Sequence, residues 1–381
     1  MSKRKLNIKR IVGRIKETDL QFLALVYTLL TFGLIMVLSA SSPSAFTYHN
    51  NSFHFFNRQL LWAVFGSFLM FGVASIDYRL LKKPKILMAV IGGTIFLLLL
   101  VLIPGPGKLV NGARRWLNLG PATFQPSELA KIVVIIFLAN AISSHPDRIK
   151  KMKYVATYFA CACIIAGIVI LEPHKSCAIV IIMVSAIMLF AGGADIKKIL
   201  PAGLLIAGLL LIIILSSEYS RERVFSFLDP FKDIQGDGWQ VVQSLYAIGS
   251  GGILGVGPGK SRQKYLNIPE PQNDFIFSII AEELGLFGGL LVMVLFSLLI
   301  IRGIKIAFNA PDMFGSLLVV GIMALIAVQV IINIAVVTAS MPCTGMPLPF
   351  FSYGGTSLAI TMGTMGIVLN VARQSRNKSG E

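Results

Sequence analysis

The stretch KSRQKYLNIPEPQNDFIFSIIAEELG, residues 260–285, decides how the rest of the chain is interpreted. A polar segment with two prolines leads into Asn273 and Asp274, and a long apolar helix pattern follows at once. Asp274 is therefore expected where water gives way to hydrocarbon. Ionisable groups at membrane depth are costly, so such a carboxylate is a candidate functional residue. The remaining chain is predicted to be the scaffold that places this segment.

The composition is that of a polytopic membrane protein. The 381 residues have a mean hydropathy of +0.77, and 55% are apolar while only 14% are charged. A soluble domain carries about 25% charged residues. Repeated apolar runs of about 18 or more residues indicate membrane-spanning helices. We therefore predict an all-α integral membrane protein.

The apolar runs predict about ten transmembrane helices in one domain, residues 20–373. A basic N-terminus, residues 1–19, and a tail, residues 374–381, are expected in the cytoplasm, and a large extracellular loop, residues 216–273, between helices 7 and 8. The first run is too long for the apolar core of a cleaved signal, so we expect it to be retained. The predicted spans are residues 20–41, 59–76, 85–103, 126–144, 153–171, 175–192, 197–215, 274–301, 313–339 and 355–373.

The formal net charge of +16 is explained by topology rather than by a nucleic-acid partner. Of the 34 Lys and Arg, 22 fall in the termini and in alternate, predicted inner loops, 11 fall on the opposite side, and Lys131 lies within a span. Cytoplasmic loops of membrane proteins carry such an excess of basic residues. We therefore expect membrane lipid as a partner and no nucleic acid.

The predicted outer segments 104–125 and 216–273 keep cations that this rule disfavours, among them Arg114, Arg115 and Lys264. A binding site for an anion is one reason to keep them, and tolerance of exposed loops is the other. In the run that ends QPSELAK, Glu128 and Lys131 are three residues apart and share a helix face. They are expected either to neutralise each other or to present Lys131 to an anionic lipid head group.

Two further segments offer neutral groups. Gln243 and Ser244 can orient sugars by hydrogen bonds, and the glycines between Gly249 and Gly259 resemble a phosphate-binding loop only weakly, because no strand precedes them. A hinge or an interfacial turn is the favoured interpretation. The segment 341–357 contains three prolines, which prevent a regular helix, so it is a well-packed re-entrant turn or lines a wet cavity.

Asp274 has two alternative roles. At the first turn of a helix the dipole favours the carboxylate, while partial desolvation raises its proton affinity, which together suit a general base. Alternatively, Asn273 or Asp274 caps the helix. Glu282 and Glu283 lie deeper and on other faces, and we expect them to pair with other helices rather than with Asp274.

These motifs together resemble the SEDS family, which includes FtsW, RodA and SpoVE, with a preference for the FtsW–SpoVE branch. The resemblance covers nearly the whole chain from Asp19 and rests on NGARRW, QPSELAK, QSLYAIGSGGILGVG, NDFIFSIIAEELG and PLPFFSYGGTS in this order. The family's essential aspartate corresponds to Asp274. One departure is His174, which stands where many members have an aspartate, so any role of that aspartate, including a metal contact, does not transfer.

The resemblance implies a peptidoglycan glycosyltransferase of the bacterial cytoplasmic membrane that polymerises lipid II and acts with a class B penicillin-binding protein during division, elongation or sporulation. Transfer from a polyprenyl diphosphate needs a base and cations for the leaving group, but no acid, because diphosphate leaves unprotonated. No paired carboxylates and no D-x-D motif are present, so a divalent cation, Mg²⁺ or Mn²⁺, is compatible with the sequence but not indicated by it.

We predict Asp274 as the catalytic base. The predicted substrate-binding residues are Arg114, Arg115, Gln125, Glu128, Lys131, Gln243, Ser244, Lys264, Glu270, Pro349, Ser352, Gly354 and Gly355. Two alternative functions stay open, a flippase for the lipid-linked precursor and a non-catalytic platform for a transpeptidase. A flippase requires a polar path through the bundle, and charges deep in the predicted helices are few.

Overall fold

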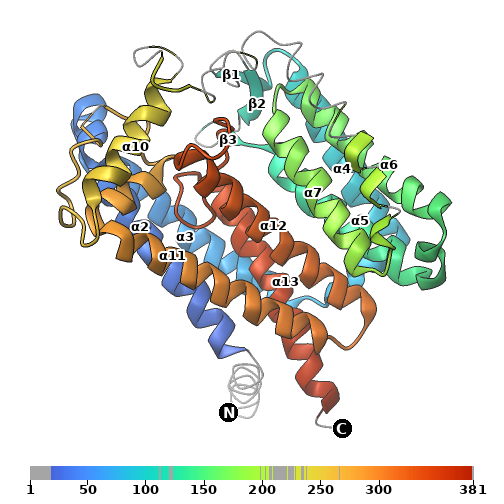
Figure 1. The fold of residues 1–381 in the computed structure, drawn as a ribbon. Helices are drawn as coiled ribbons and strands as arrows, with labels where there is room; N and C mark the ends of the chain where they lie inside the picture. The colour runs from blue at the N-terminus through green and yellow to red at the C-terminus, as the bar shows by residue number, and fades with distance from the viewer. Residues whose placement is uncertain are drawn as a thin grey trace.

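The computed structural model is a helical bundle with a small sheet at one end (Figure 1). It describes residues 19–110, 113–118, 120, 123–197, 236, 238–265 and 267–379, with scattered residues between 199 and 232. The helices are α2 (Leu20–His49), α3 (His54–Ser75), η1 (Tyr78–Lys82), α4 (Pro84–Leu102), α5 (Pro126–Ser144), η2 (Pro146–Lys150), α6 (Met152–Leu171), α7 (Lys175–Ala191), α10 (Trp239–Gly251), α11 (Ile276–Phe308), α12 (Met313–Val337) and α13 (Gly355–Ser379).

Eight of these helices are long and apolar enough to cross a membrane, and α7 is a shorter apolar helix. They correspond to nine of the ten predicted spans, and the chain is a multi-pass membrane protein. The predicted span 197–215 lies mostly outside the described residues, as do residues 1–18 of the predicted N-terminus and much of the predicted loop before residue 238. The start of α2 and the end of α13 lie at the same end of the bundle (Figure 1).

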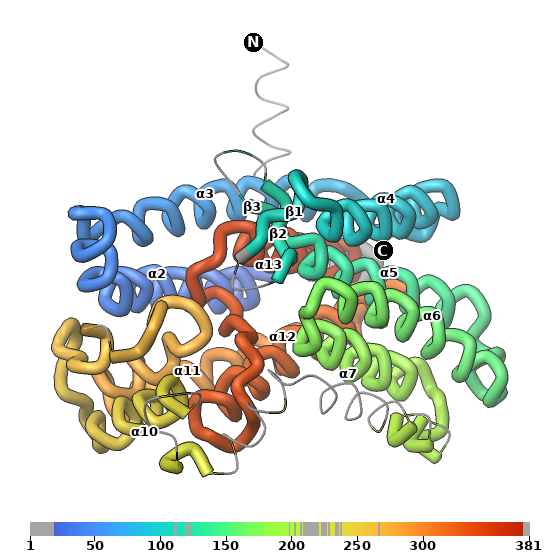
Figure 2. Tube along the Cα trace, turned by 90° about the horizontal axis from the view of Figure 1, so that it is seen from above, coloured from blue at the N-terminus to red at the C-terminus, as the bar shows by residue number. Residues whose placement is uncertain are grey.

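The helices form two groups with α12 and α13 between them. One group contains α2, α10 and α11, and the other contains α4 to α7 (Figures 1 and 2). Close approach of α3 to α13 depends on small residues, because a Cβ at Gly366 would lie 2.4 Å from the carbonyl oxygen of Met70. Small residues at helix interfaces are typical of membrane proteins, where backbones must approach closely.

Several helices continue beyond the predicted spans. Helix α2 continues to His49, through Pro43, and ends at Asn50 in the left-handed region. Helix α11 continues to Phe308, and its Arg302 forms an ion pair with Asp19 at 2.6 Å. Helix α13 continues to Ser379, through most of the predicted tail. Hydropathy identifies the part of a helix in hydrocarbon, whereas the hydrogen-bonded turns continue into the polar region.

The end of the bundle opposite the termini carries the three-stranded antiparallel sheet, with the order β1 (Gly107–Val110), β2 (Ala113–Asn118) and β3 (Thr123–Phe124). Residues 104–125 were predicted only as an outer segment, with no strands. The tight turn from α4 requires glycine, because a Cβ at Gly107 would lie 1.9 Å from the carbonyl oxygen of Val101. The sheet places β2 beside the start of α5.

Candidate functional site

Asp274 lies just before α11, whose N-cap residue is Phe275. We predicted Asp274 in the first turn, and the structure places it two residues before Ile276. The alternative that Asn273 or Asp274 is the N-cap residue is therefore wrong, and the side-chain amide of Asn273 instead donates to Glu270 at 2.7 Å. Asp274 remains close to the positive end of the helix dipole.

A buried asparagine fixes the main chain at Asp274. Asn333 of α12 is 1% exposed, and its Nδ2 donates to the carbonyl oxygens of Asp274, at 2.7 Å, and of Met346, at 2.8 Å. The side chain of Asp274 lies near Gly345, where a Cβ would be 3.7 Å from Oδ2. One side chain therefore ties Asp274 to the segment 341–354.

Asp274 lines a cavity of about 850 Å³, a volume within the range of small-molecule sites. Its walls come from α3, β2, β3, the start of α5, the α6–α7 turn, the residues just before α11 and residues 345–361. Eight predicted site residues line it: Asp274, Arg115, Gln125, Glu128, Pro349, Ser352, Gly354 and Gly355. The structure thus brings together segments that are far apart in the chain.

The segment 341–354 is irregular and packed, as predicted, and it lines the cavity. The Oγ of Ser352 accepts a hydrogen bond from the main-chain N–H of Leu348 at 2.7 Å. Gln59 of α3 donates to the carbonyl oxygen of Ser352 and accepts from the N–H of Gly354, each at 3.2 Å. Side-chain partners therefore replace the helical hydrogen bonds that the prolines remove.

Arg114 and Arg115 are neighbours on strand β2, but only one of them lines the cavity. Arg115 lines the cavity and donates to the carbonyl oxygen of Pro173, whereas Arg114 is not among the lining residues. Both arginines were predicted to bind the substrate, and the structure places only Arg115 at the cavity wall.

Glu128 and Lys131 form the predicted ion pair, with Nζ 2.7 Å from Oε1 and side chains 6% and 2% exposed. Glu128 also accepts from Ser357 of α13 at 3.2 Å. Lys131 is not among the cavity-lining residues. Of the two alternatives for Lys131, the structure therefore favours mutual neutralisation over contact with a lipid head group.

Gln243 and Ser244 are buried in α10, and neither is among the residues that line the cavity. The Oγ of Ser244 donates to the carbonyl oxygen of Val337 at 2.7 Å and lies 2.6 Å from the Oγ of Ser278. The expectation that this pair shapes the sugar groove is therefore not supported by its position. Ser244 instead joins α10 to α11 and α12.

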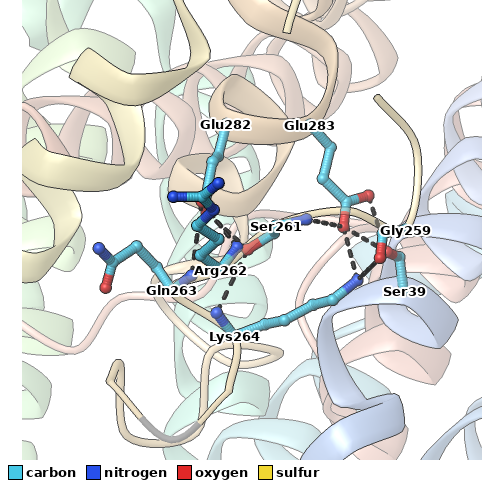
Figure 3. A network of polar contacts seen from close by, with 8 residues as sticks. All are labelled: Ser39, Gly259, Ser261, Arg262, Gln263, Lys264, Glu282 and Glu283. Atoms are coloured by element: carbon cyan, nitrogen blue, oxygen red, sulfur yellow. Dashed lines mark hydrogen bonds and ion pairs between the residues drawn. The ribbon is translucent and has the colours of Figure 1, made fainter. Parts of the chain in front are cut away.

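Lys264 is held in a buried network rather than in the cavity around Asp274 (Figure 3). Its Nζ lies 2.8 Å from Glu283 Oε1 and also donates to Ser39 of α2 and to the carbonyl oxygen of Gly259. Glu282 accepts from the N–H of Arg262 at 2.8 Å. Glu283 reaches another helix, as predicted, whereas the bonds of Glu282 go to the loop.

The glycines between Gly249 and Gly259 pack against α11 beside this network and do not form a phosphate-binding loop. The N–H of Gly257 donates to the carbonyl oxygen of Glu283 at 3.0 Å, and α11 is interrupted at Gly285, where φ is +66°. A Cβ at Gly285 would lie 2.4 Å from the nitrogen of Gly255. Glycine is needed where two main chains approach so closely. The predicted hinge or turn is a tightly packed crossing.

The α6–α7 turn supplies two groups that the sequence analysis did not assign. His174 lines the cavity, and its Nδ1 lies 3.1 Å from Ser127 Oγ and 3.3 Å from Gln125 Nε2. Burial lowers the pKa of His174 to about 3, and Arg115 and Lys131 lower it further, so the imidazole is neutral. Burial raises the pKa of Glu172 to about 8, although Arg115 opposes this shift.

Arg58 and Trp62 of α3 also line the cavity and were not predicted. The only sequence signal for Arg58 is a basic residue on the outer side of a predicted span, where the positive-inside rule disfavours it. Within the described residues, no group of three or more His, Cys, Asp or Glu is placed to hold a metal ion. A divalent cation therefore stays an untested prediction.

Comparison with known proteins identifies the family. Residues 20–377 match the family model of FtsW, RodA and SpoVE, described as "Cell cycle protein". Stage V sporulation protein E of Bacillus subtilis (strain 168) is 43% identical over 359 residues, which cover 94% of this chain and 98% of the relative. The probable peptidoglycan glycosyltransferase FtsW of Geobacter sulfurreducens (strain DL-1 / KN400) is 37% identical over 371 residues, covering 96% and 98%.

Solved structures agree with these matches. A chain from a study of polymerization and crosslinking by a peptidoglycan synthase complex superposes with a TM-score of 0.76 at 30% identity, covering 94% of this chain and 98% of that one. The rod shape determining protein RodA of Thermus thermophilus gives a TM-score of 0.69 at 27% identity, covering 94% and 97%. The chain therefore belongs to the FtsW, RodA and SpoVE family of polytopic membrane proteins.

Proposed function

We propose that this protein is a peptidoglycan glycosyltransferase that polymerises lipid II, a disaccharide peptide linked to undecaprenyl diphosphate, at the outer face of the bacterial cytoplasmic membrane. The observation that carries the proposal is a single cavity lined by the Asp274 carboxylate and by two arginines, Arg58 and Arg115. A base for an acceptor hydroxyl and cations for a leaving diphosphate are thereby held in one space. Related proteins named as such glycosyltransferases support the reaction class.

In the proposed reaction, the 4-hydroxyl oxygen of the acceptor sugar attacks the anomeric carbon of the donor. The bond from that carbon to the diphosphate oxygen breaks, and the diphosphate leaves with the electron pair. Asp274 accepts the hydroxyl proton, and the configuration at the anomeric carbon inverts. A general base contributes about 10²- to 10⁴-fold to such a step. Arg115 and Arg58 stabilise the charge that develops on the leaving group.

The partner is proposed to be a class B penicillin-binding protein that cross-links the new strand. The similarity to a chain from a peptidoglycan synthase complex supports a protein partner of this kind. The substrate enters from the membrane, because the polyprenyl tail of lipid II stays in hydrocarbon while the cavity lies at the outer end of the bundle. No metal ion is needed in this scheme.

The test is polymerisation of lipid II by the purified protein, with and without the cognate transpeptidase. We expect glycan strands from the wild type and a loss of at least about 100-fold for Asp274→Asn, which removes the base while keeping the shape of the side chain. If the Asp274→Asn variant still polymerises lipid II, Asp274 is not the general base. Translocation of lipid II in proteoliposomes without chain growth indicates a flippase, and rescue of a deletion strain by Asp274→Asn indicates a platform.

A further inference from the structure

A second cavity of about 410 Å³ lies next to the cavity that contains Asp274. Asn273 and Tyr353 line both cavities, and Asn273 directly precedes Asp274. A molecule that fills both spaces would therefore pass within one residue of the proposed base. The second cavity is lined by Ser44, Tyr48, Phe55, Lys264, Ile268, Pro269, Glu270, Pro271, Gln272, Asn273 and Tyr353.

The two charged groups that line the second cavity, Lys264 and Glu270, each have partners within the protein. The Lys264 ammonium is bonded to Glu283, to Ser39 and to the Gly259 carbonyl oxygen (Figure 3). The Glu270 carboxylate accepts from Asn273. The lining contains no arginine, in contrast to the first cavity with Arg58 and Arg115. This chemistry suits a neutral ligand rather than a diphosphate.

Two carboxamide oxygens of lining residues have no hydrogen-bond partner among the described residues. They are Oε1 of Gln272, whose residue is 3% exposed, and Oδ1 of Asn273. The orientation of the Asn273 amide is fixed, because its nitrogen must face the Glu270 carboxylate. Both oxygens have less than 1 Å² of exposed surface, so a ligand reaches them only after the side chains turn toward the cavity. A buried acceptor without a donor is costly, so a ligand that supplies O–H or N–H groups favours this turn.

Aromatic side chains form the rest of a typical sugar-binding wall. Phe55 and Tyr353 meet edge to face, with ring centroids 5.1 Å apart, and Tyr48 lies on the outer part of α2. Ligand sites combine such apolar and aromatic walls with a few polar groups that fix orientation. Glu270 has a φ of +47°, an unusual backbone conformation for a residue with a side chain, and strain of this kind clusters at ligand sites.

We propose that the second cavity binds an N-acetylated amino sugar of the substrate, adjacent to the sugar that reacts at Asp274. This inference rests on the proposed function and adds a neutral sugar subsite to it. Hydroxyl and acetamido N–H groups would donate to Gln272 and Asn273, and the apolar face of the ring would lie on the aromatic wall. The sugar belongs either to the lipid II monomer or to the strand already polymerised, and the two sources share this chemistry.

The first experiment measures binding of chitotetraose, the tetramer of N-acetylglucosamine, to the purified full chain by saturation-transfer NMR. We expect Gln272→Leu to weaken binding about 10-fold or more, because one such hydrogen bond contributes about 1.5 kcal/mol. Gln263→Leu is the matched control, since Gln263 lies in the same segment and outside both cavities. Tyr48→Ala provides a second variant that preserves the fold, because Tyr48 is 72% exposed.

The second experiment measures polymerisation with the same variants. Gln272→Leu should raise KM with little change in kcat, because it removes binding energy rather than the base. A larger effect with lipid II monomer alone assigns the subsite to the monomer, and a larger effect with preformed lipid-linked oligomers assigns it to the strand. Unchanged chitotetraose binding and unchanged KM in both Gln272→Leu and Tyr48→Ala overturn the inference.

The outcomes separate this inference from the proposed function. Asp274→Asn should abolish polymerisation and still bind chitotetraose as the wild type does. If Asp274→Asn is inactive but the Gln272 and Tyr48 variants behave as the wild type, the result supports the proposed function and contradicts the sugar subsite. If the wild type binds chitotetraose through Gln272 but does not polymerise lipid II, the result supports the sugar subsite and contradicts the proposed function.

Discussion

Asn333 donates a hydrogen bond to the main-chain carbonyl oxygen of Asp274 at 2.7 Å, and the same nitrogen donates to Met346 at 2.8 Å. The bond runs from a buried residue near the end of α12 to a residue two positions before the start of α11. It fixes the position of the proposed base through the main chain, at the wall of the cavity that Asp274 lines. Asn333 is thus a positioning residue.

We expect Asn333→Leu to lower kcat about 10- to 100-fold with a smaller effect on KM, since a shift of about 1 Å in a catalytic group costs about this much. Polymerisation kinetics with lipid II provide the measurement. Gln329→Leu, one turn earlier on α12 and also buried, is the matched control and should keep its kcat. An Asn333→Leu protein with normal kcat would contradict the positioning role.

The two neighbouring arginines of β2 give a second prediction. Arg115→Ala should lower kcat/KM about 10- to 100-fold, because a charge-assisted hydrogen bond to a diphosphate contributes about 1.5–3 kcal/mol. Arg114→Ala should reduce it several-fold less, since Arg114 is not among the cavity-lining residues. Steady-state kinetics give kcat/KM for both variants, and thermal unfolding first confirms that both are folded. Equal losses would mean that both arginines reach the substrate.

The buried ion pair of Lys264 and Glu283 predicts a strong thermodynamic coupling. Lys264→Met leaves the Glu283 carboxylate buried without its cation, which should lower stability by about 3–5 kcal/mol. Adding Glu283→Leu should recover much of this loss, because no buried charge then remains. A double-mutant cycle of thermal unfolding in detergent measures the coupling. Additive single effects would show that the pair does not act as a unit.

The buried Glu172 predicts a pH-dependent change in stability. Its folded pKa, about 8, lies above the ordinary value of an unfolded glutamate, so folding favours the protonated acid. The resulting penalty is absent below about pH 4 and grows as the pH rises toward 8. Glu172→Gln removes it, so this variant should unfold at a higher temperature than the wild type at pH 8 and at the same temperature near pH 4.5.

Thermal unfolding from pH 4.5 to 8.5 measures this difference. Glu270→Gln is the control, because Glu270 is exposed and its substitution should give no such trend. A constant difference between Glu172→Gln and the wild type across this range would contradict a raised pKa. A variant that is less stable at pH 8 would show that the ionised carboxylate of Glu172 pairs favourably with Arg115.

The sequence predicted the spans well, because long apolar runs depend on local composition. The bounds of α5, residues 126–144, were predicted without error, since Pro126 begins the helix and polar residues follow its end. Helices that continue beyond the hydrocarbon, such as the last turns of α2 and α11, have no hydropathy signal there. Their extension depends on main-chain hydrogen bonds and on partners such as the Arg302–Asp19 pair.

The lining of the cavity was predictable where the signal lies in a residue's own segment. Asp274 and the turn at Ser352 were identified from a boundary carboxylate and from proline spacing. Gln243 and Ser244 do not line the cavity, and the sequence could not show this because a polar residue in an outer segment is indistinguishable, in sequence, from one that bonds a neighbouring helix. His174 and Arg58 were not assigned because their contribution depends on which segments meet. Arg114 was grouped with Arg115 because two adjacent arginines in an outer segment carry the same sequence signal, and only the packing of β2 shows which one lines the cavity.

The crossing of Gly255 and Gly285 attaches the outer segment to α11 through peptide groups, in addition to the side-chain network of Lys264 and Glu283. Peptide groups make these bonds, so neutral drift can change the neighbouring residues without detaching the segment from α11. Inactivating alleles far from any substrate should therefore concentrate at these two glycines in a genetic screen. An alanine at either position would push the two main chains apart and displace the segment that leads to Asp274.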